Sequence, residues 1–228
     1  MRVVAAVLAT ACLGLGACSS RRSTHAAATT TSTSAVDAPR IDPVSFTTHI
    51  TNRYFPLVPG VTYVYEGTEG NKPERNDVAV TSSTKLVMGV TCVVVHAVTV
   101  LDGINAQETF DYYAQDADGA VWQFGEDAKQ FGADGRVTSS AGSWSAGVRR
   151  AQPGVVMTAH PVVGATIDHA TVLETGTTVV VPLSTYRDAI VTSNDVEKRV
   201  YAPGVGFVQS DVVKGAKEHV ALVRVVSS

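Results

Sequence analysis

The segment 111–127, DYYAQDADGAVWQFGED, has the residue types from which a metal site or a carboxylate-based catalytic site is built. It contains five carboxylates and no basic residue, in a chain of 228 residues. Carboxylate oxygens are preferred ligands of calcium, and positioned carboxylates act as general acids and bases. One hypothesis is therefore a metal-dependent hydrolase that uses the carboxylates of this segment. The candidate metal ligands are Asp116, Asp118, Glu126 and Asp127.

The same segment also has the pattern of a β-hairpin. Asp118 and Gly119 form a strong turn signal, because glycine, and to a lesser degree aspartate, tolerates the positive φ of a tight turn. An EF-hand loop follows D-x-D-x-D-G with a glutamate at position twelve, whereas Gly119 comes two positions too early. We therefore expect mainly a hairpin with solvated carboxylates at its tip. No catalytic motif is complete, so we expect a protein that is not an enzyme and has no cofactor.

Strand patterns dominate the folded part of the chain. Apolar and polar residues alternate in segments such as 61–67 and 105–116, and turn signals recur about every ten residues. This spacing favours an all-β fold with an antiparallel meander. Segment 90–101 is apolar on both faces, with Cys92 as a small core residue, so both faces need a cover. A curled sheet, forming an open or half-closed β-barrel, supplies that cover, and a two-sheet sandwich is the alternative.

A curled sheet would direct one set of alternating side chains into its interior. Large aromatic residues at such positions could contact an apolar ligand. The ligand-binding candidates chosen by this alternation are Tyr63, Tyr65, Phe110, Tyr112, Trp122 and Phe124.

One short helix is expected before the strands, over residues 41–52. Asp42 is a suitable N-cap, and Pro43 suits the first helical position. Phe46 and Ile50 lie four residues apart, so they would share one face of this helix.

The N-terminal segment has the features of a lipoprotein signal peptide. Arg2 precedes an uncharged, mostly apolar run over residues 3–17, which is too short for a membrane-spanning helix. The run ends in LGAC, which resembles the bacterial lipobox, and the resemblance implies cleavage before Cys18 and lipidation of its thiol. We therefore expect a signal peptide over residues 1–17. A lipid-anchored, flexible tether rich in Ser, Thr and Ala follows over 18–39, and a single β-rich domain over 40–228.

The charge balance argues against nucleic acid as a partner. The formal net charge is −3, and the basic pairs at 21–22 and 149–150 are isolated rather than part of a basic stripe. The expected partners are the membrane, through lipidated Cys18, and a lipid or another envelope protein. The expected location is the extracytoplasmic face of the cell membrane or of the outer membrane.

Four motifs resemble those of a family of uncharacterised bacterial envelope lipoproteins. They are ITNRYFPLVPG, TFDYYAQDADGAVWQFGED, GSWSAGV followed by PGVVM, and YAPGVGFV. The family pattern has proline where Arg53 stands, tyrosine where Gln123 stands and glutamate where Ser145 stands. At fold level only, the curled sheet is also similar to the half-barrel of LolA-like carriers, which hold acyl chains on a concave apolar face.

The anchor, the tether and the doubly apolar segment together favour a binding function. We expect a membrane-anchored envelope lipoprotein that binds or carries an apolar or amphipathic ligand, or an envelope partner. The metal-dependent hydrolase is one alternative. A structural or assembly protein of the envelope is the other.

Overall fold

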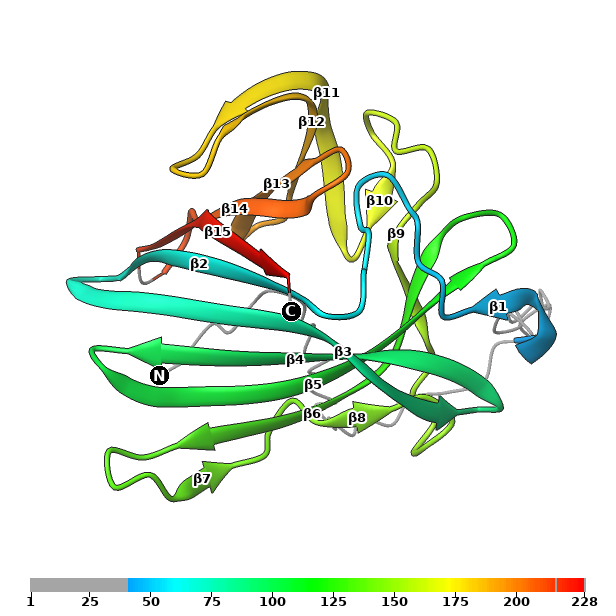
Figure 1. Ribbon diagram of the computed structural model, residues 1–228, viewed down its shortest axis with the longest axis horizontal. Coiled ribbons are helices and arrows are strands. Elements are labelled where there is room, and N and C mark those ends of the chain that lie inside the picture. Colours follow the sequence, from blue (N-terminus) through cyan, green and yellow to red (C-terminus); the bar gives the residue numbers. More distant parts are fainter. Residues whose placement is uncertain (1–40, 216, 228) are drawn as a thin grey trace, which may run out of the picture.

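The computed structural model describes residues 41–215 and 217–227. The expected signal peptide, Cys18 and the tether lie outside these residues. The described chain is nearly all β-strand, and Figure 1 shows an antiparallel sheet that bends so that its two arms face each other. The expectation of an all-β, open antiparallel meander is confirmed. Within the described ranges, no helix has the length and apolar character that a membrane span requires.

Long strands joined by tight turns build the first arm. They are β2 (Val61–Glu69), β3 (Lys72–Val87), β4 (Val90–Leu101), β5 (Ile104–Asp116), β6 (Val121–Phe131) and the short β7 (Val137–Ser139). The second arm consists of β10 (Thr166–Ile167), β11 (Ala170–Val180), β12 (Thr185–Ser193), β13 (Glu197–Ala202), β14 (Gly206–Val212) and β15 (Glu218–Ser227). Three short strands pair beside β5 or β6, namely β1 (Phe46–Thr47), β8 (Trp144–Ser145) and β9 (Gly154–Met157).

The arms join where the last strand of the chain lies beside the first long one. β15 pairs with β2, from Glu218 opposite Glu69 to Ser227 opposite Val61. The order along the sheet is β10-β11-β12-β13-β14-β15-β2-β3-β4-β5-β6-β7. At the far ends of the arms, β9 pairs with β6, and the Asp168 N–H at the β10–β11 turn donates to the Val155 carbonyl of β9 at 3.3 Å. The two arms therefore meet along β9.

β4 is buried on both faces, as its sequence requires. Val93 and Val95 belong to a cluster between the two arms, here named the central cluster. Cys92 and Val94 belong to a smaller cluster on the opposite face, named the flank cluster. The central cluster takes residues from both arms, among them Tyr65, Tyr113, Ile190, Tyr201 and Leu222. The flank cluster is covered by Ile41, Phe46, Trp144 and Ala146. The sheet therefore curls around packed side chains.

The loop 50–57 closes one end of the central cluster, here named the capped end. Asn52 is buried, and its side-chain amide donates to the carbonyls of Gly119 and Thr158 at 2.8 and 3.1 Å. Its carbonyl oxygen accepts from the Tyr54 N–H at 2.9 Å. These bonds fasten the loop to the β5–β6 turn and to the end of β9, and they place Phe55 against Tyr113 with ring centroids 5.4 Å apart. The motif ITNRYFPLVPG thus forms a lid over the core.

The helix expected over residues 41–52 is wrong beyond its first turn. Asp42 does act as an N-cap, but the helix is a single 3₁₀ turn, η1 (Pro43–Ser45). The chain then becomes extended, and β1 pairs with the end of β5. Phe46 consequently packs in the flank cluster, whereas Ile50 is buried in the central cluster. Pairing with a distant strand overrides the local capping signal.

Gly67 supplies the first test of this arrangement. It lies in β2 between Val220 of β15 and Glu74 of β3, and a Cβ added there would stand 1.7 Å from the backbone carbonyl oxygen of His219. Since backbone cannot move aside as a flexible side chain does, we expect Gly67→Ala to lower the free energy of unfolding by about 2 kcal/mol or more, measured by urea denaturation. Gly154→Ala is the control, because nothing lies within 4 Å of its added Cβ. Equal stability of the two variants would contradict the close contact of β2 and β15.

Candidate functional site

The six aromatic residues predicted to bind a ligand do not face one cavity. Tyr63 and Tyr65 are buried in the central cluster, where the Tyr65 hydroxyl donates to the Phe207 carbonyl at 3.0 Å. The other four, Phe110, Tyr112, Trp122 and Phe124, belong to the flank cluster on the opposite face of the sheet. Phe46 packs edge-on against Phe124, with centroids 5.2 Å apart. These rings are therefore occupied in packing.

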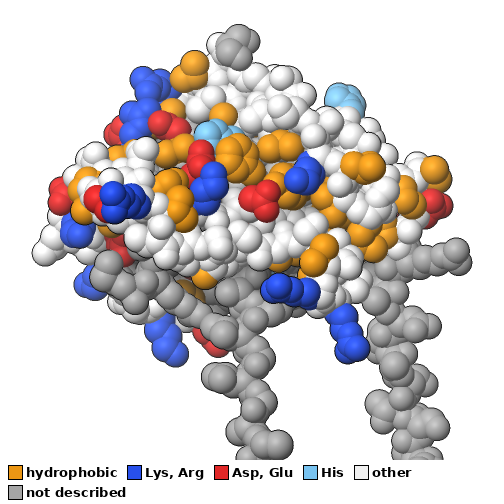
Figure 2. Space-filling view, turned by 90° about the horizontal axis from the view of Figure 1, so that it is seen from below, with side chains coloured by type: hydrophobic (Ala, Val, Ile, Leu, Met, Phe, Trp, Pro, Cys, Tyr) orange, Lys and Arg blue, Asp and Glu red, His pale blue; other side chains and the backbone are white. Residues whose placement is uncertain are grey.

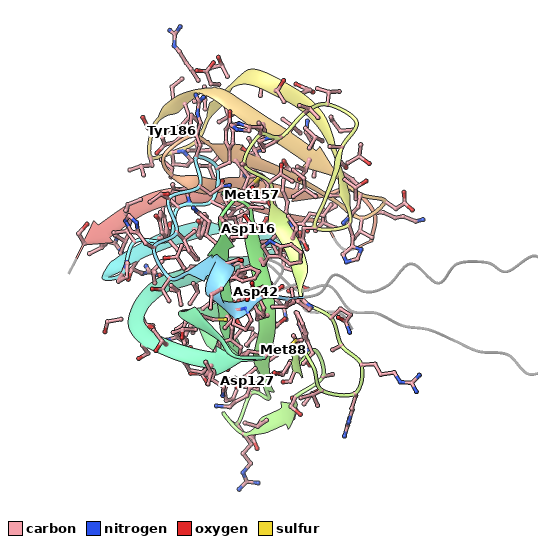
Figure 3. All side chains as sticks on the ribbon, turned by 90° about the vertical axis from the view of Figure 1, so that its right-hand side faces the viewer. Asp42, Met88, Asp116, Asp127, Met157 and Tyr186 are labelled. Carbon is pink, nitrogen blue, oxygen red and sulfur yellow. The ribbon has the colours of Figure 1, made fainter. Side chains whose placement is uncertain are left out.

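The four carboxylates predicted to bind a metal also lie apart. Asp116 accepts from the backbone of the β5–β6 turn and from the Trp122 indole N–H at 2.7 Å, so it stabilises the predicted hairpin. Asp118 lies at the exposed tip of that turn, and Asp127 accepts from the Tyr112 hydroxyl at 2.5 Å. Figure 3 shows Asp116 and Asp127 at well-separated positions. Within residues 41–215 and 217–227, no three His, Cys, Asp or Glu side chains are placed to hold a metal ion.

Glu126 lies opposite Asp111 across β5 and β6, and both carboxyls are buried. Asp111 accepts from the Gln123 amide at 2.8 Å and from the Thr109 hydroxyl at 3.0 Å, whereas Oε2 of Glu126 has no hydrogen-bond partner. Burial raises the pKa of Asp111 to about 7, although these hydrogen bonds oppose the rise. Burial, followed by the charges of Asp111 and Asp127, raises the pKa of Glu126 to about 8. Burial therefore favours the protonated form of each carboxyl.

A pocket of about 1040 Å³ opens beside this carboxyl pair, between the loop 141–156 and the β10–β11 turn. We name it the arginine pocket. Its walls are largely apolar, from Trp144, Pro153, Val155 and Val156, and Gln123 joins them from β6. The ionisable side chains that line it are Arg149, Arg150, Asp168 and His169. Gln123 thus connects the pocket to the buried Asp111.

Backbone strain is concentrated at this pocket. Seven non-glycine residues of the described chain have φ between 48° and 65°, a region that disfavours side chains with a Cβ. Four of them line the arginine pocket, as two adjacent pairs: Arg149 and Arg150, and Asp168 and His169. Strained backbone costs about 1 kcal/mol or more per residue and tends to occur at functional sites. The strain therefore marks this pocket as the candidate site.

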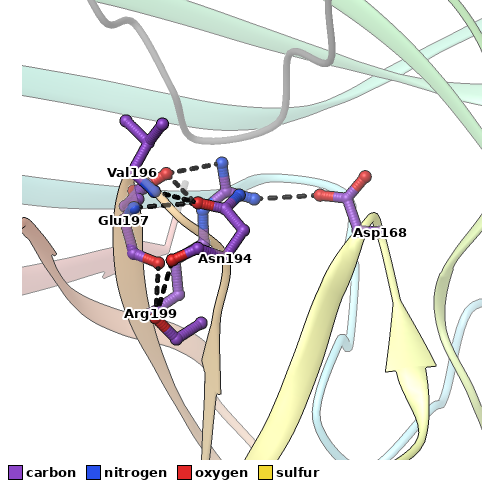
Figure 4. A network of polar contacts seen from close by, with 6 residues as sticks. Asp168, Asn194, Val196, Glu197 and Arg199 are labelled. Carbon is purple, nitrogen blue, oxygen red and sulfur yellow. Dashed lines mark hydrogen bonds and ion pairs between the residues drawn. The ribbon is translucent and has the colours of Figure 1, made fainter. Parts of the chain in front are cut away.

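Arg199 of β13 fixes the strained β10–β11 turn. Its Nη1 donates to Asp168 Oδ2 at 2.9 Å, while its Nε and Nη2 donate to Glu197 Oε2 at 2.9 and 2.8 Å (Figure 4). The Arg199 and Asp168 side chains are each 11% exposed, so this ion pair is shielded from water. Asn194 accepts from the backbone N–H groups of Val196 and Glu197 and holds the start of β13. The negative charge of Asp168 is therefore paired with Arg199 within the protein.

Arg149 and Arg150 are the free cations of the pocket. Both are exposed, and neither forms a hydrogen bond or an ion pair with any other described residue. The turn that carries them is closed by the Gly147 N–H donating to the Ala151 carbonyl at 2.9 Å and the Ala151 N–H donating to the Val148 carbonyl at 2.9 Å. The sequence showed these two arginines only as an isolated pair. Their proximity to the β10–β11 turn depends on tertiary structure.

Elsewhere on the surface, charges and hydrophobic groups alternate. Phe110 stacks on His96 with centroids 4.4 Å apart, and Glu108 contacts both His96 and Lys129 at 3.0 and 3.2 Å. Figure 2 shows hydrophobic side chains interspersed with both signs of charge on the face seen from below. The arginine pocket differs from this surface. Its one carboxylate, Asp168, is already paired with Arg199, so Arg149 and Arg150 have no carboxylate of the pocket to pair with.

The buried Glu126 predicts a pH-dependent stability. Its pKa is about 8 in the folded chain against an ordinary value of 4.5, so the folded state keeps the proton while the unfolded state loses it. Stability must therefore fall as the pH rises from about 4.5 to 8. We expect Glu126→Gln to flatten this slope and, at pH 8.5, to raise the unfolding midpoint by roughly 2–4 °C or more. Thermal scans across pH measure both, with the exposed Glu174→Gln as control. A slope unchanged from wild type would contradict the shifted pKa.

Comparisons of the chain with protein-family models, with curated proteins and with solved structures give no match. The resemblance of the four motifs to envelope lipoproteins therefore stays a prediction.

Proposed function

We propose that this chain is a non-catalytic binding protein of the bacterial envelope, anchored by lipid at Cys18, which holds an anionic amphiphile in the arginine pocket. The observation that carries the proposal is the combination of two unpaired arginines with apolar walls in one pocket. A pocket of about 1040 Å³ is large enough for an acyl or alkyl chain together with its head group.

The arginines suit a phosphate or carboxylate head group. A guanidinium presents its N–H donors in a planar fork that matches two oxygens of such an anion. Arg149 and Arg150 have no partner to give up within the described part of the chain, so binding an anion costs no ion pair there. The apolar side chains of Trp144, Pro153 and Val155 would cover the chain that follows the head group.

The pocket is also held in shape before a ligand arrives. The turn 147–151 is closed by its own backbone hydrogen bonds, and Arg199 fixes the opposite turn through Asp168. Fixing the binding groups in advance reduces the entropy lost on association. This argument favours a binding site over a surface loop without a ligand.

The expected anchor and tether would bring such a pocket to its ligand. A flexible tether of about twenty residues has a root-mean-square reach on the order of 25 Å. The domain would therefore stay near the membrane surface, where anionic amphiphiles are concentrated, and still turn freely. This geometry supports a carrier or scavenger of amphiphiles.

Cys18 tests the location. If the Cys18 thiol carries the lipid, Cys18→Ala should move most of the protein from the membrane fraction to the soluble extracytoplasmic fraction. The reason is that the short signal-peptide segment anchors the protein to the membrane less firmly than two or three acyl chains do. Metabolic labelling with an alkyne fatty acid, followed by fractionation, measures both changes. Cys12→Ala is the matched control and should keep label and location. Unlabelled wild-type protein, or wild-type protein in the cytosol, would refute the anchor.

Arg149 and Arg150 test the ligand. With full-length protein in amphipol, isothermal titration should show octyl phosphate binding at least tenfold more tightly than octyl glucoside, which has the same tail and no charge. Arg149→Gln combined with Arg150→Gln should weaken octyl phosphate binding at least tenfold, whereas Arg136→Gln, an exposed arginine of the β6–β7 hairpin, should not. No binding of octyl phosphate, or equal binding by all three proteins, would overturn the proposal.

A further inference from the structure

The end of the sheet opposite the loop 50–57 has a chemistry of its own, and we name it the acidic end. The β2–β3, β4–β5, β12–β13 and β14–β15 turns all lie there, since antiparallel strands alternate in direction. Glu197 is the first residue of β13, Glu218 is the first of β15, and Glu74 is the third of β3. All three side chains are buried.

Strand register places Glu74 and Glu218 on either side of one gap. Gly67 of β2 is paired with Glu74 on one side and with Val220 on the other, while Glu218 is paired with Glu69. Gly67 brings no side chain to the strip of β2 between the two glutamates, and the next β2 residue on that face is the half-buried Glu69. Burial, followed by the charges of Glu74, Glu197 and Glu69, raises the pKa of Glu218 to about 8, although the charge of Arg199 opposes the rise. The three carboxyls therefore act on one another.

Several acceptor atoms at this end have no donor among the residues that the structure describes. Glu74 Oε2 and Glu197 Oε1 are buried without a hydrogen-bond partner. So is Oε1 of Gln107, which lies in the neighbouring row of the sheet, formed by Asn76, Thr99 and Gln107. That row is ordered, because Asn76 donates to Glu74 Oε1 at 2.8 Å and Thr99 donates to Asn76 at 2.6 Å, with Gln107 paired opposite Thr99. An unsatisfied buried acceptor costs about 1–3 kcal/mol, so three on one side of the sheet call for donors from outside.

Among residues 41–215 and 217–227, the cations near this end do not supply those donors. Arg199 is occupied by Glu197 Oε2 and Asp168. Lys72 and Lys217 are exposed at the rim, and neither forms an ion pair with a described carboxylate. A bare metal ion does not fit either, because no three carboxylates of the described residues converge on one point.

We propose that the acidic end binds an organic cation that carries several N–H donors, such as a polyamine. Its ammonium groups would stabilise the ionised forms of Glu74 and Glu218, which release their protons on binding, and would donate to the unpaired oxygens of Glu74, Glu197 and Gln107. The N–H groups of a linear polyamine are spread along its chain, as the acceptor oxygens are spread along the acidic end. A polyamine can therefore contact several of these oxygens, whereas a single ion cannot. The site is separate from the arginine pocket and has the opposite charge.

Titration of the full-length protein with spermidine tests this site. We expect saturable binding by wild type, weakened at least tenfold by Glu74→Gln and by Glu218→Gln, both of which keep the side-chain shape. Glu174→Gln removes an exposed carboxylate of β11 and should leave the affinity unchanged. Thermal midpoints of the two site variants should not fall, because neutralising a buried carboxyl relieves repulsion.

A second probe separates hydrogen bonding from charge. Hexamethonium and 1,6-diaminohexane both carry two charges at the ends of six methylenes, but only the diamine has N–H donors, so hexamethonium should bind at least tenfold more weakly than the diamine. Equal binding of the two cations would refute the role of the unpaired acceptors. Absence of saturable spermidine binding, or the same affinity in wild type and in both site variants, would refute the site itself.

Discussion

The fold depends on burying both faces of β4. Val93 and Val95 alternate with Cys92 and Val94, so neither face of this strand tolerates water. The chain meets this constraint in two ways: the second arm covers one face, and β1 with the loop around β8 covers the other. Because the loop 141–153 is held on the flank side while β9, which follows it, pairs with β6, a pocket is left between these two segments and the β10–β11 turn. The position of the candidate site thus follows from how the core is covered.

The interior of the sheet is divided along its length. Apolar side chains fill it toward the capped end, whereas buried carboxyls and amides line it toward the acidic end. Burial raises the pKa of a carboxyl, and an ionised carboxylate without a partner in the interior lowers stability at neutral pH. Such groups are therefore expected where a bound ligand or a bound proton compensates for the cost of burying the charge. Arg199 stands at the boundary, where it links Glu197 of the acidic end to Asp168 of the arginine pocket. One buried guanidinium therefore positions elements of both candidate sites.

Local patterns predicted the strands and turns well, because alternation and Asp-Gly turns act over a few residues. The helix beyond η1 failed, since the pairing of β1 with β5 is a contact between distant segments. The aromatic candidates were assigned to one cavity because alternation shows which residues of a strand share a face. It does not show which of the two faces points into the curl of the sheet. Arg149 and Asp168 come together through the curl of the sheet, whereas Glu74 and Glu218 come together because β3 and β15 both pair with β2. No short-range pattern contains that information, so both candidate sites required the structure.

Amide hydrogen exchange across β4 is the most direct measurement of the central claim. If both faces of this strand are sealed, the amides of Val93, Val94 and Val95 should exchange only through global unfolding, with free energies equal to the unfolding free energy. The amides of β11 toward Val180, where side chains are largely exposed, should exchange through smaller openings. Exchange of β4 as fast as that of β11 would show that one face is open, and it would contradict the account.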